Sequence, residues 1–139
     1  MTTATTPGPA RRELELAGQT VVLIGGSAGI GLETARRARA EGADVVLTGR
    51  NPGRLSQAAA EVGAQRTAAF DVHDAAALQG FFADLPAPID HVLITAGGPV
   101  YGPLLEMDSA QVREALSDHV TLGLEFAVRR DPEGRTSHV

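Results

Sequence analysis

The feature that most restricts the fold of this chain is a regular alternation of short apolar runs with longer stretches of helical periodicity. The first run, 20–24, has the length and composition of a strand buried on both faces, and further strands are predicted at 44–48, 65–70 and 89–95. Each run is followed by apolar residues recurring every three or four positions, which is typical of an amphipathic helix. Strands that alternate with helices predict right-handed crossovers and a parallel sheet, so the predicted fold class is α/β with four βα units.

Residues with strong end preferences mark the predicted helices. Asn51 and Asp74 stand where an N-cap acceptor is expected, and Pro52 suits a first helical position. Asp108 begins the last helix, and with Gln111 three residues later it resembles a capping box. The predicted helices cover 30–41, 52–61, 75–83 and 109–128.

The two ends of the chain differ in composition from its centre. Residues 1–16 are rich in Thr, Pro and Gly and are predicted to form a disordered tail. Residues 129–139 show no apolar period and are predicted to be a polar, solvated tail. Between them, residues 17–128 have the size of one domain.

Composition excludes several classes of function. A formal net charge of −5 argues against a basic face for nucleic acid, and the absence of cysteine excludes disulfides and thiolate zinc sites. The histidines show no ligand spacing, so no metal site is predicted. No apolar run is long enough to span a membrane, and the N-terminus lacks the hydrophobic segment of a secretory signal. We therefore expect a cytoplasmic protein without nucleic-acid or membrane partners.

A glycine-rich loop, Ile-Gly-Gly-Ser-Ala-Gly-Ile-Gly at 24–31, joins the first predicted strand to the first helix. Gly25 permits a tight turn, Gly29 allows close approach of a pyrophosphate, and Gly31 allows close packing of helix on strand. The helix N-terminus would attract phosphate. A Walker-type loop is excluded because it needs a lysine, which the chain lacks. The alternative is a turn that serves packing only. The predicted dinucleotide contacts are Gly25, Ser27, Ala28, Gly29, Ile30 and Gly31.

The spacing of these glycines resembles the loop of the short-chain dehydrogenase/reductase family. The resemblance extends to three further motifs at strand ends: Thr48, Gly49 and Arg50; Asp71 and Val72; and Thr95, Ala96 and Gly97. Ile24 and Thr95 stand where the family usually has Thr and Asn. The resemblance covers about residues 17–128 and implies a Rossmann-like, doubly wound parallel sheet of strand order 3-2-1-4.

The end of the second predicted strand favours NADP over NAD as the cofactor. An NAD-binding unit usually places Asp or Glu there, whereas this chain has Gly49 followed by Arg50. The guanidinium of Arg50 suits a 2′-phosphate, which a carboxylate would repel. The alternative is that Arg50 is an ordinary surface arginine.

The resemblance also implies contacts with the adenosine half of the nucleotide. Asp71 and Val72 would flank the adenine, and Ala96 and Gly97 would line the ribose. Asp71 can equally cap the turn into the following helix, and both roles are compatible.

The resemblance implies hydride transfer between a nicotinamide and a carbonyl or alcohol, carried by a tyrosine, a lysine four residues later and an upstream serine. The chain has no lysine, and its one tyrosine, Tyr101, is followed by Gly-Pro-Leu-Leu. His119 lies near the position of an active-site asparagine in the family, although a helical histidine without a catalytic role is the alternative. No catalytic residue is therefore assigned, and we expect the nucleotide-binding part of a family member, truncated before its Tyr–Lys pair.

Three functions remain open. The first is an NADP-dependent oxidoreductase that is catalytically incomplete as given. The second is a non-catalytic module that binds NADP or a partner, and the third is a fragment without function. The last helix carries apolar residues beyond a single stripe, and by resemblance this implies a homodimer through that helix.

Overall fold

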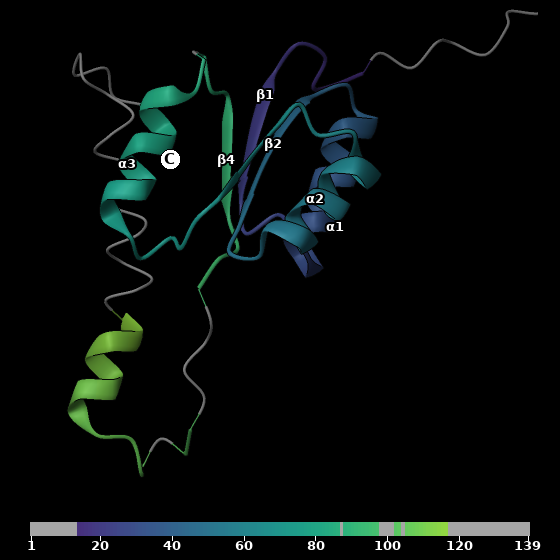
Figure 1. Ribbon diagram of the computed structural model, residues 1–139. Coiled ribbons are helices and arrows are strands. Elements are labelled where there is room, and N and C mark those ends of the chain that lie inside the picture. Colours follow the sequence, from purple (N-terminus) through teal and green to yellow (C-terminus); the bar gives the residue numbers. More distant parts are fainter. Residues whose placement is uncertain (1–13, 87, 98–101, 104, 117–139) are drawn as a thin grey trace, which may run out of the picture. The chain divides into compact units, whose positions relative to one another are not determined.

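The computed structural model describes residues 14–86, 88–97, 102–103 and 105–116 of the 139-residue chain. The chain divides into two compact units, Met1–Ala96 and Gly97–Val139, which are described separately. The first unit contains all the labelled strands and helices of Figure 1.

The first unit is built on a four-stranded parallel sheet. Its strands are β1 (Thr20–Ile24), β2 (Asp44–Gly49), β3 (Arg66–Ala69) and β4 (His91–Ile94). Their order across the sheet is β3-β2-β1-β4, and all three neighbouring pairs are parallel. The predicted fold class and strand order are confirmed.

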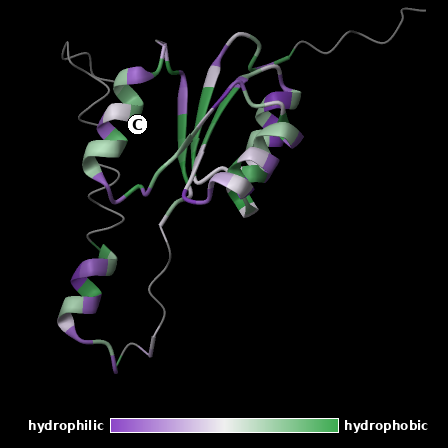
Figure 2. Cartoon of the chain, in the orientation of Figure 1, coloured by the Kyte–Doolittle hydropathy of each residue, from purple (hydrophilic) through white to green (hydrophobic). Residues whose placement is uncertain are grey.

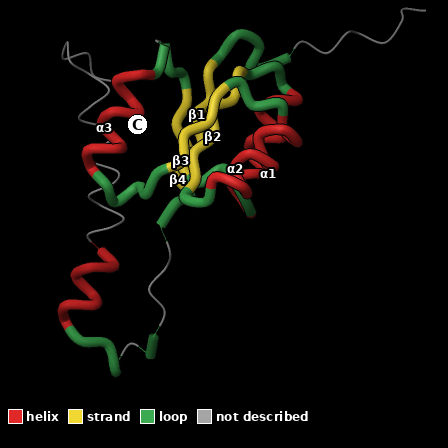
Figure 3. The backbone as a smooth tube through the Cα atoms, in the orientation of Figure 1, coloured by secondary structure: helices red, strands yellow, loops and turns green. Residues whose placement is uncertain are grey.

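Three helices join these strands and lie on both faces of the sheet. Helices α1 (Gly29–Ala40) and α2 (Pro52–Val62) cover one face, and α3 (Ala75–Asp84) lies on the other (Figures 1 and 3). The chain moves outward from β1 through β2 to β3 and then returns to the other side of β1 as β4. The carboxyl ends of β1 and β4 therefore form the switch point at which open α/β sheets bind ligands.

The apolar runs of the sequence become the two buried faces of the central strands. Val21 and Leu23 of β1 pack with the helices α1 and α2, whereas Val22 and Ile24 point to the opposite face and are 0% and 1% exposed. Because successive side chains of a strand alternate between faces, a strand covered on both sides must be apolar throughout. Figure 2 shows these strands as the hydrophobic centre of the unit.

The opposite face is closed by apolar residues of α3. Leu78 is fully buried and Phe81 nearly so. The ring of Phe81 lies 5.3 Å from that of Phe70, which follows β3, so the entry to α3 is anchored by an aromatic pair.

A turn over 15–18 leads into β1, and it begins within the stretch predicted to be a tail. The Leu16 N–H donates to the Glu41 carbonyl at 3.0 Å, and the Leu16 side chain packs against the core. Residues 1–13, the remainder of that predicted tail, lie outside the described residues.

In the second unit, the described residues include a helix over 109–116. Asp108 Oδ1 accepts hydrogen bonds from the N–H groups of Ala110 and Gln111, both at 2.8 Å. The Gln111 side-chain oxygen accepts in return from the Asp108 N–H at 3.1 Å. The predicted capping box is confirmed. The predicted continuation of this helix to 128, its dimer surface and the tail at 129–139 lie outside the described residues.

Candidate nucleotide-binding site

The glycine loop leaves β1 in a backbone conformation that requires glycine. Gly25 has a φ of +99°, and the N–H groups of Gly25 and Gly26 both donate to the Thr48 carbonyl of β2, at 3.3 and 2.9 Å. A Cβ built on Gly25 would lie 2.6 Å from the Ala96 nitrogen. The tight turn predicted for Gly25 is therefore present, and it holds the loop against the ends of β2 and β4.

Gly31 lets α1 begin in direct contact with this turn. A Cβ at Gly31 would overlap the Gly25 carbonyl oxygen and would lie 2.7 Å from Thr95 Oγ1. The predicted close packing of the helix on the strand end is therefore present. Gly29, in contrast, has a φ of +56° and open space around its Cβ position, so it presents bare backbone at the surface.

Thr95 connects the end of β4 to the glycine loop. Its hydroxyl donates to the Gly25 carbonyl at 3.1 Å, and the N–H groups of Thr95 and Ala96 donate to the Ile24 carbonyl at 2.8 and 2.9 Å. The threonine therefore supplies a hydrogen bond at the position where the family usually has asparagine. These bonds also bring Ala96 next to the loop.

The N-terminus of α1 differs from those of α2 and α3. Asn51 accepts from the Arg54 N–H at the start of α2, and Asp74 accepts from two N–H groups at the start of α3. Ala28 occupies the N-cap position of α1, and its side chain accepts no hydrogen bond from the helix. The first turn of α1 holds no acidic residue. N–H groups without a side-chain acceptor, at the positive end of a helix, are suited to an anion. Ala28, Gly29 and Ile30 are exposed there, and Ile30 is 76% exposed.

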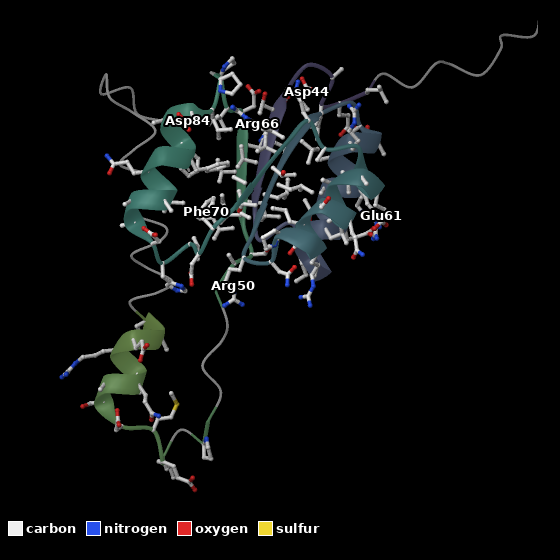
Figure 4. All side chains as sticks on the ribbon, in the orientation of Figure 1. Asp44, Arg50, Glu61, Arg66, Phe70 and Asp84 are labelled. Atoms are coloured by element: carbon white, nitrogen blue, oxygen red, sulfur yellow. The ribbon has the colours of Figure 1, made fainter. Side chains whose placement is uncertain are left out.

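The end of β2 lies beside the same loop. A Cβ on Gly49 would lie 3.0 Å from Ser27 Oγ and 3.3 Å from Ser27 Cβ, so a larger side chain at Gly49 would crowd Ser27. Arg50 follows and is exposed. Figure 4 shows Arg50 at the carboxyl edge of the sheet, whereas Asp44, Arg66 and Asp84 lie at the amino edge.

Asp71 lies in the turn between β3 and α3, with its carboxylate exposed. The backbone N–H of His73 donates to Asp71 Oδ1, and the His73 ring nitrogen Nδ1 lies 3.0 Å from the same oxygen. The backbone hydrogen bond from His73 is the main cause that lowers the pKa of Asp71, and the His73 ring and the charge of Arg50 lower it further. The charge of Arg50 is the smallest of these contributions, so His73 is the main influence on this carboxylate.

Val72 is only 6% exposed, so its side chain belongs to the core and only its backbone is available to a ligand. Gly97 begins the second unit and is exposed with a φ of +102°. His119 and Tyr101 lie outside the described residues. His73 is a residue of this site that the sequence motifs did not indicate. The available signal was a histidine two residues beyond a strand-end carboxylate.

In the part of the chain that the structure describes, no group of three His, Cys, Asp or Glu side chains is arranged to hold a metal ion. No helix among these residues is long and apolar enough to cross a membrane.

The comparison with protein families matches residues 19–121 to the short chain dehydrogenase family. The chain belongs to this family. Among curated relatives, it is 33% identical over 129 residues to the 3-ketodihydrosphingosine reductase TSC10 of Eremothecium gossypii, covering 81% of this chain and 42% of that protein.

Solved structures of the same family share the fold. One short chain dehydrogenase/reductase family protein has a TM-score of 0.73 and 32% identity, over 86% of this chain and 50% of that one. The structure of BdcA in complex with NADPH has a TM-score of 0.70 and 27% identity, over 83% and 47% of the two chains. The chain spans 30% to 48% of the length of the curated relatives it matches.

Proposed function

We propose that this chain binds NADP(H) as the nucleotide-binding part of a short-chain dehydrogenase/reductase. The observation that carries the proposal is the N-terminus of α1, which has no side-chain cap and opens from the glycine loop at the carboxyl edge of the sheet. The pyrophosphate would lie against the backbone from Ser27 to Gly31, with its charge balanced by the helix N-terminus. The exposed backbone at Gly29 fits this role because no side chain fills the space in front of it.

The adenosine half of the nucleotide would lie beside the ends of β2 and β3. Arg50 would pair with a 2′-phosphate and Asp71 would accept from the adenine amino group. Val72 would contribute through its backbone, and Ala96 and Gly97 would lie along the ribose. The preference for NADP is supported by Arg50, by the absence of a carboxylate at Gly49, and by the NADPH found in the related BdcA structure.

When bound, the cofactor supplies a hydride to a carbonyl or accepts one from an alcohol. The residues assigned here bind and orient the nucleotide and do not take part in proton transfer. Because the sequence contains no lysine, the family's Tyr–Lys pair is not among these 139 residues. A non-catalytic NADP-binding module is therefore the second candidate function, and the missing lysine is the observation that favours it. His119 remains a candidate from sequence alone.

The test is a titration of the chain with NADPH and NADH, in wild type and in Arg50→Ala. Loss of a charge-assisted contact to phosphate is worth about 1.5–3 kcal/mol, so NADPH affinity should fall about 10- to 150-fold while NADH affinity changes little. Arg66→Ala is the matched control, because Arg66 donates to the Asp84 carbonyl at the amino edge of the sheet. If Arg50→Ala leaves NADPH affinity unchanged, the assignment of NADP is wrong.

A further inference from the structure

The two oxygens of the Asp71 carboxylate have different surroundings. Oδ1 receives the His73 backbone N–H at 3.0 Å and lies 3.0 Å from His73 Nδ1. Among the described residues, no group donates a hydrogen bond to Oδ2. The carboxylate is therefore held by one oxygen and presents the other to solvent.

We propose that His73 is a positioning residue that holds Asp71 so that Oδ2 meets the exocyclic amino group of adenine. This inference rests on the proposed function, since it concerns the adenine of the nicotinamide nucleotide. His73 itself does not touch the nucleotide in this arrangement. It acts through Asp71, with Nδ1–H donating to Oδ1.

The ring adds a second restraint to a carboxylate that the backbone holds by a single hydrogen bond. The side chains of Asp71 and His73 are 53% and 47% exposed, so both lie at the surface. The backbone N–H of residue 73 holds Oδ1 whatever side chain follows, but a second donor on the same oxygen restricts the carboxylate rotation further. Ordering a side chain before binding removes part of the entropy lost on binding, an effect of about 3- to 10-fold in affinity.

The charge state of Asp71 suits an acceptor for an amino group. The hydrogen bonds from His73 and the positive charge of Arg50 keep the pKa of Asp71 below its ordinary value, so the carboxylate is ionised at neutral pH. An ionised carboxylate accepts hydrogen bonds and cannot donate them. It should therefore favour an amino group and disfavour a carbonyl oxygen at the same ring position.

The experiment compares the affinities of the chain for NADPH and for its hypoxanthine analogue, in which a carbonyl oxygen replaces the adenine amino group. Wild type should bind NADPH more tightly. His73→Ala should lower this ratio of affinities about 3- to 10-fold, mainly by weakening NADPH binding. His73→Asn should restore most of the ratio, because its Nδ2 stands the same number of bonds from Cα as Nδ1 of histidine.

His91→Ala is the matched control. His91 is also an exposed histidine with a ring hydrogen bond, to Gln19 Oε1 at 2.6 Å, but it lies at the amino end of β4. Its substitution should leave the ratio unchanged. Neither His73 variant removes a core contact, and the far-ultraviolet circular dichroism of each should match wild type.

The outcomes separate this inference from the function on which it rests. If wild type binds neither nucleotide, the proposed function fails and the inference falls with it. If wild type binds both equally well, or if His73→Ala keeps the full ratio, the nucleotide site stands and the role of His73 is overturned. A ratio that falls in His73→Ala and returns in His73→Asn supports it.

Discussion

At the scale of single residues, two helical glycines occupy opposite environments. A Cβ on Gly31 would overlap the Gly25 carbonyl oxygen, whereas a Cβ on Gly80, in the middle of α3, would have nothing within 4 Å. The same substitution should therefore have opposite effects at the two positions, because one glycine is needed for packing and the other only weakens its helix.

Gly31→Ala should destabilise the chain by about 1–3 kcal/mol, because α1 must move away from the glycine loop. Gly80→Ala should stabilise it by about 0.5–1 kcal/mol through helix propensity alone. Urea unfolding followed by circular dichroism measures both. Equal effects at the two sites would show that α1 does not pack against the loop in this way.

Single residues also show what local sequence can and cannot predict. The spacing of Gly25, Gly29 and Gly31 predicts their places in the turn because each role depends on the next few residues of the chain. The contact between Ser27 and Gly49 has no such local signal, since it arises only when β1 and β2 pair in register. The hydrogen bond from Thr95 to Gly25 likewise requires β4 to lie beside β1.

Among the elements, α1 differs from α2 and α3 because its N-terminus has no side-chain cap. Ala28 has an extended backbone, with φ −162° and ψ 168°, which any residue adopts and which suits an N-cap acceptor. An acceptor placed at this position would satisfy the same N–H groups that we assign to the pyrophosphate.

Ala28→Asp should therefore have two opposed effects. It should stabilise the nucleotide-free chain by about 0.5–2 kcal/mol, because a carboxylate caps α1 and interacts favourably with the helix dipole. It should also weaken NADPH binding at least 10-fold, since the carboxylate occupies the N–H groups and repels phosphate. Thermal unfolding and nucleotide titration measure the two effects.

Ala28→Ser is the uncharged control and should weaken binding less. An Ala28→Asp variant that binds NADPH as wild type does would place the phosphate elsewhere.

The bounds of the strands and helices in the first unit were predictable to within about two residues. The strands predicted at 65–70 and 89–95 are each shorter in the structure, as β3 and β4. Both are edge strands, and each pairs with only one neighbour over four residues. Backbone hydrogen bonds still join Gln65 and Phe70 to β2, and Asp90 and Thr95 to β1, so the difference concerns only the frayed ends of the strands. Helix starts were more accurate because the Asn51 and Asp74 side chains accept hydrogen bonds from backbone N–H groups only two or three residues later.

At the scale of the whole molecule, the chain combines a predicted cofactor site with a sequence that lacks lysine. A ligand that binds only the folded state stabilises it by about 2.7 kcal/mol at one hundred times its Kd. We therefore expect a cooperative thermal transition whose midpoint rises with NADPH concentration, without oxidation of NADPH in the presence of a panel of aldehydes and ketones. Calorimetry and the NADPH absorbance measure the two properties.

The remaining outcomes distinguish the functions left open by the sequence. Turnover of any carbonyl would contradict the inference that these 139 residues lack the catalytic groups. A chain without a cooperative transition, with NADPH or without it, would instead favour a fragment that does not function alone. A rise in the midpoint with no turnover supports a nucleotide-binding module.

The amino-acid sequence was sufficient for the fold class, the strand order expected from the family, the glycine turn and the helix caps. The strand order was implied by the resemblance to the family; the other features depend on periodicity and on neighbours a few residues apart, which can be read along the chain. The structure was needed to find that Ser27 meets Gly49, that Thr95 holds the Gly25 carbonyl, and that Arg50 and the His73 ring both act on Asp71. The loops that carry these groups follow different strands, and parallel pairing is what brings the carboxyl ends of those strands to one edge of the sheet.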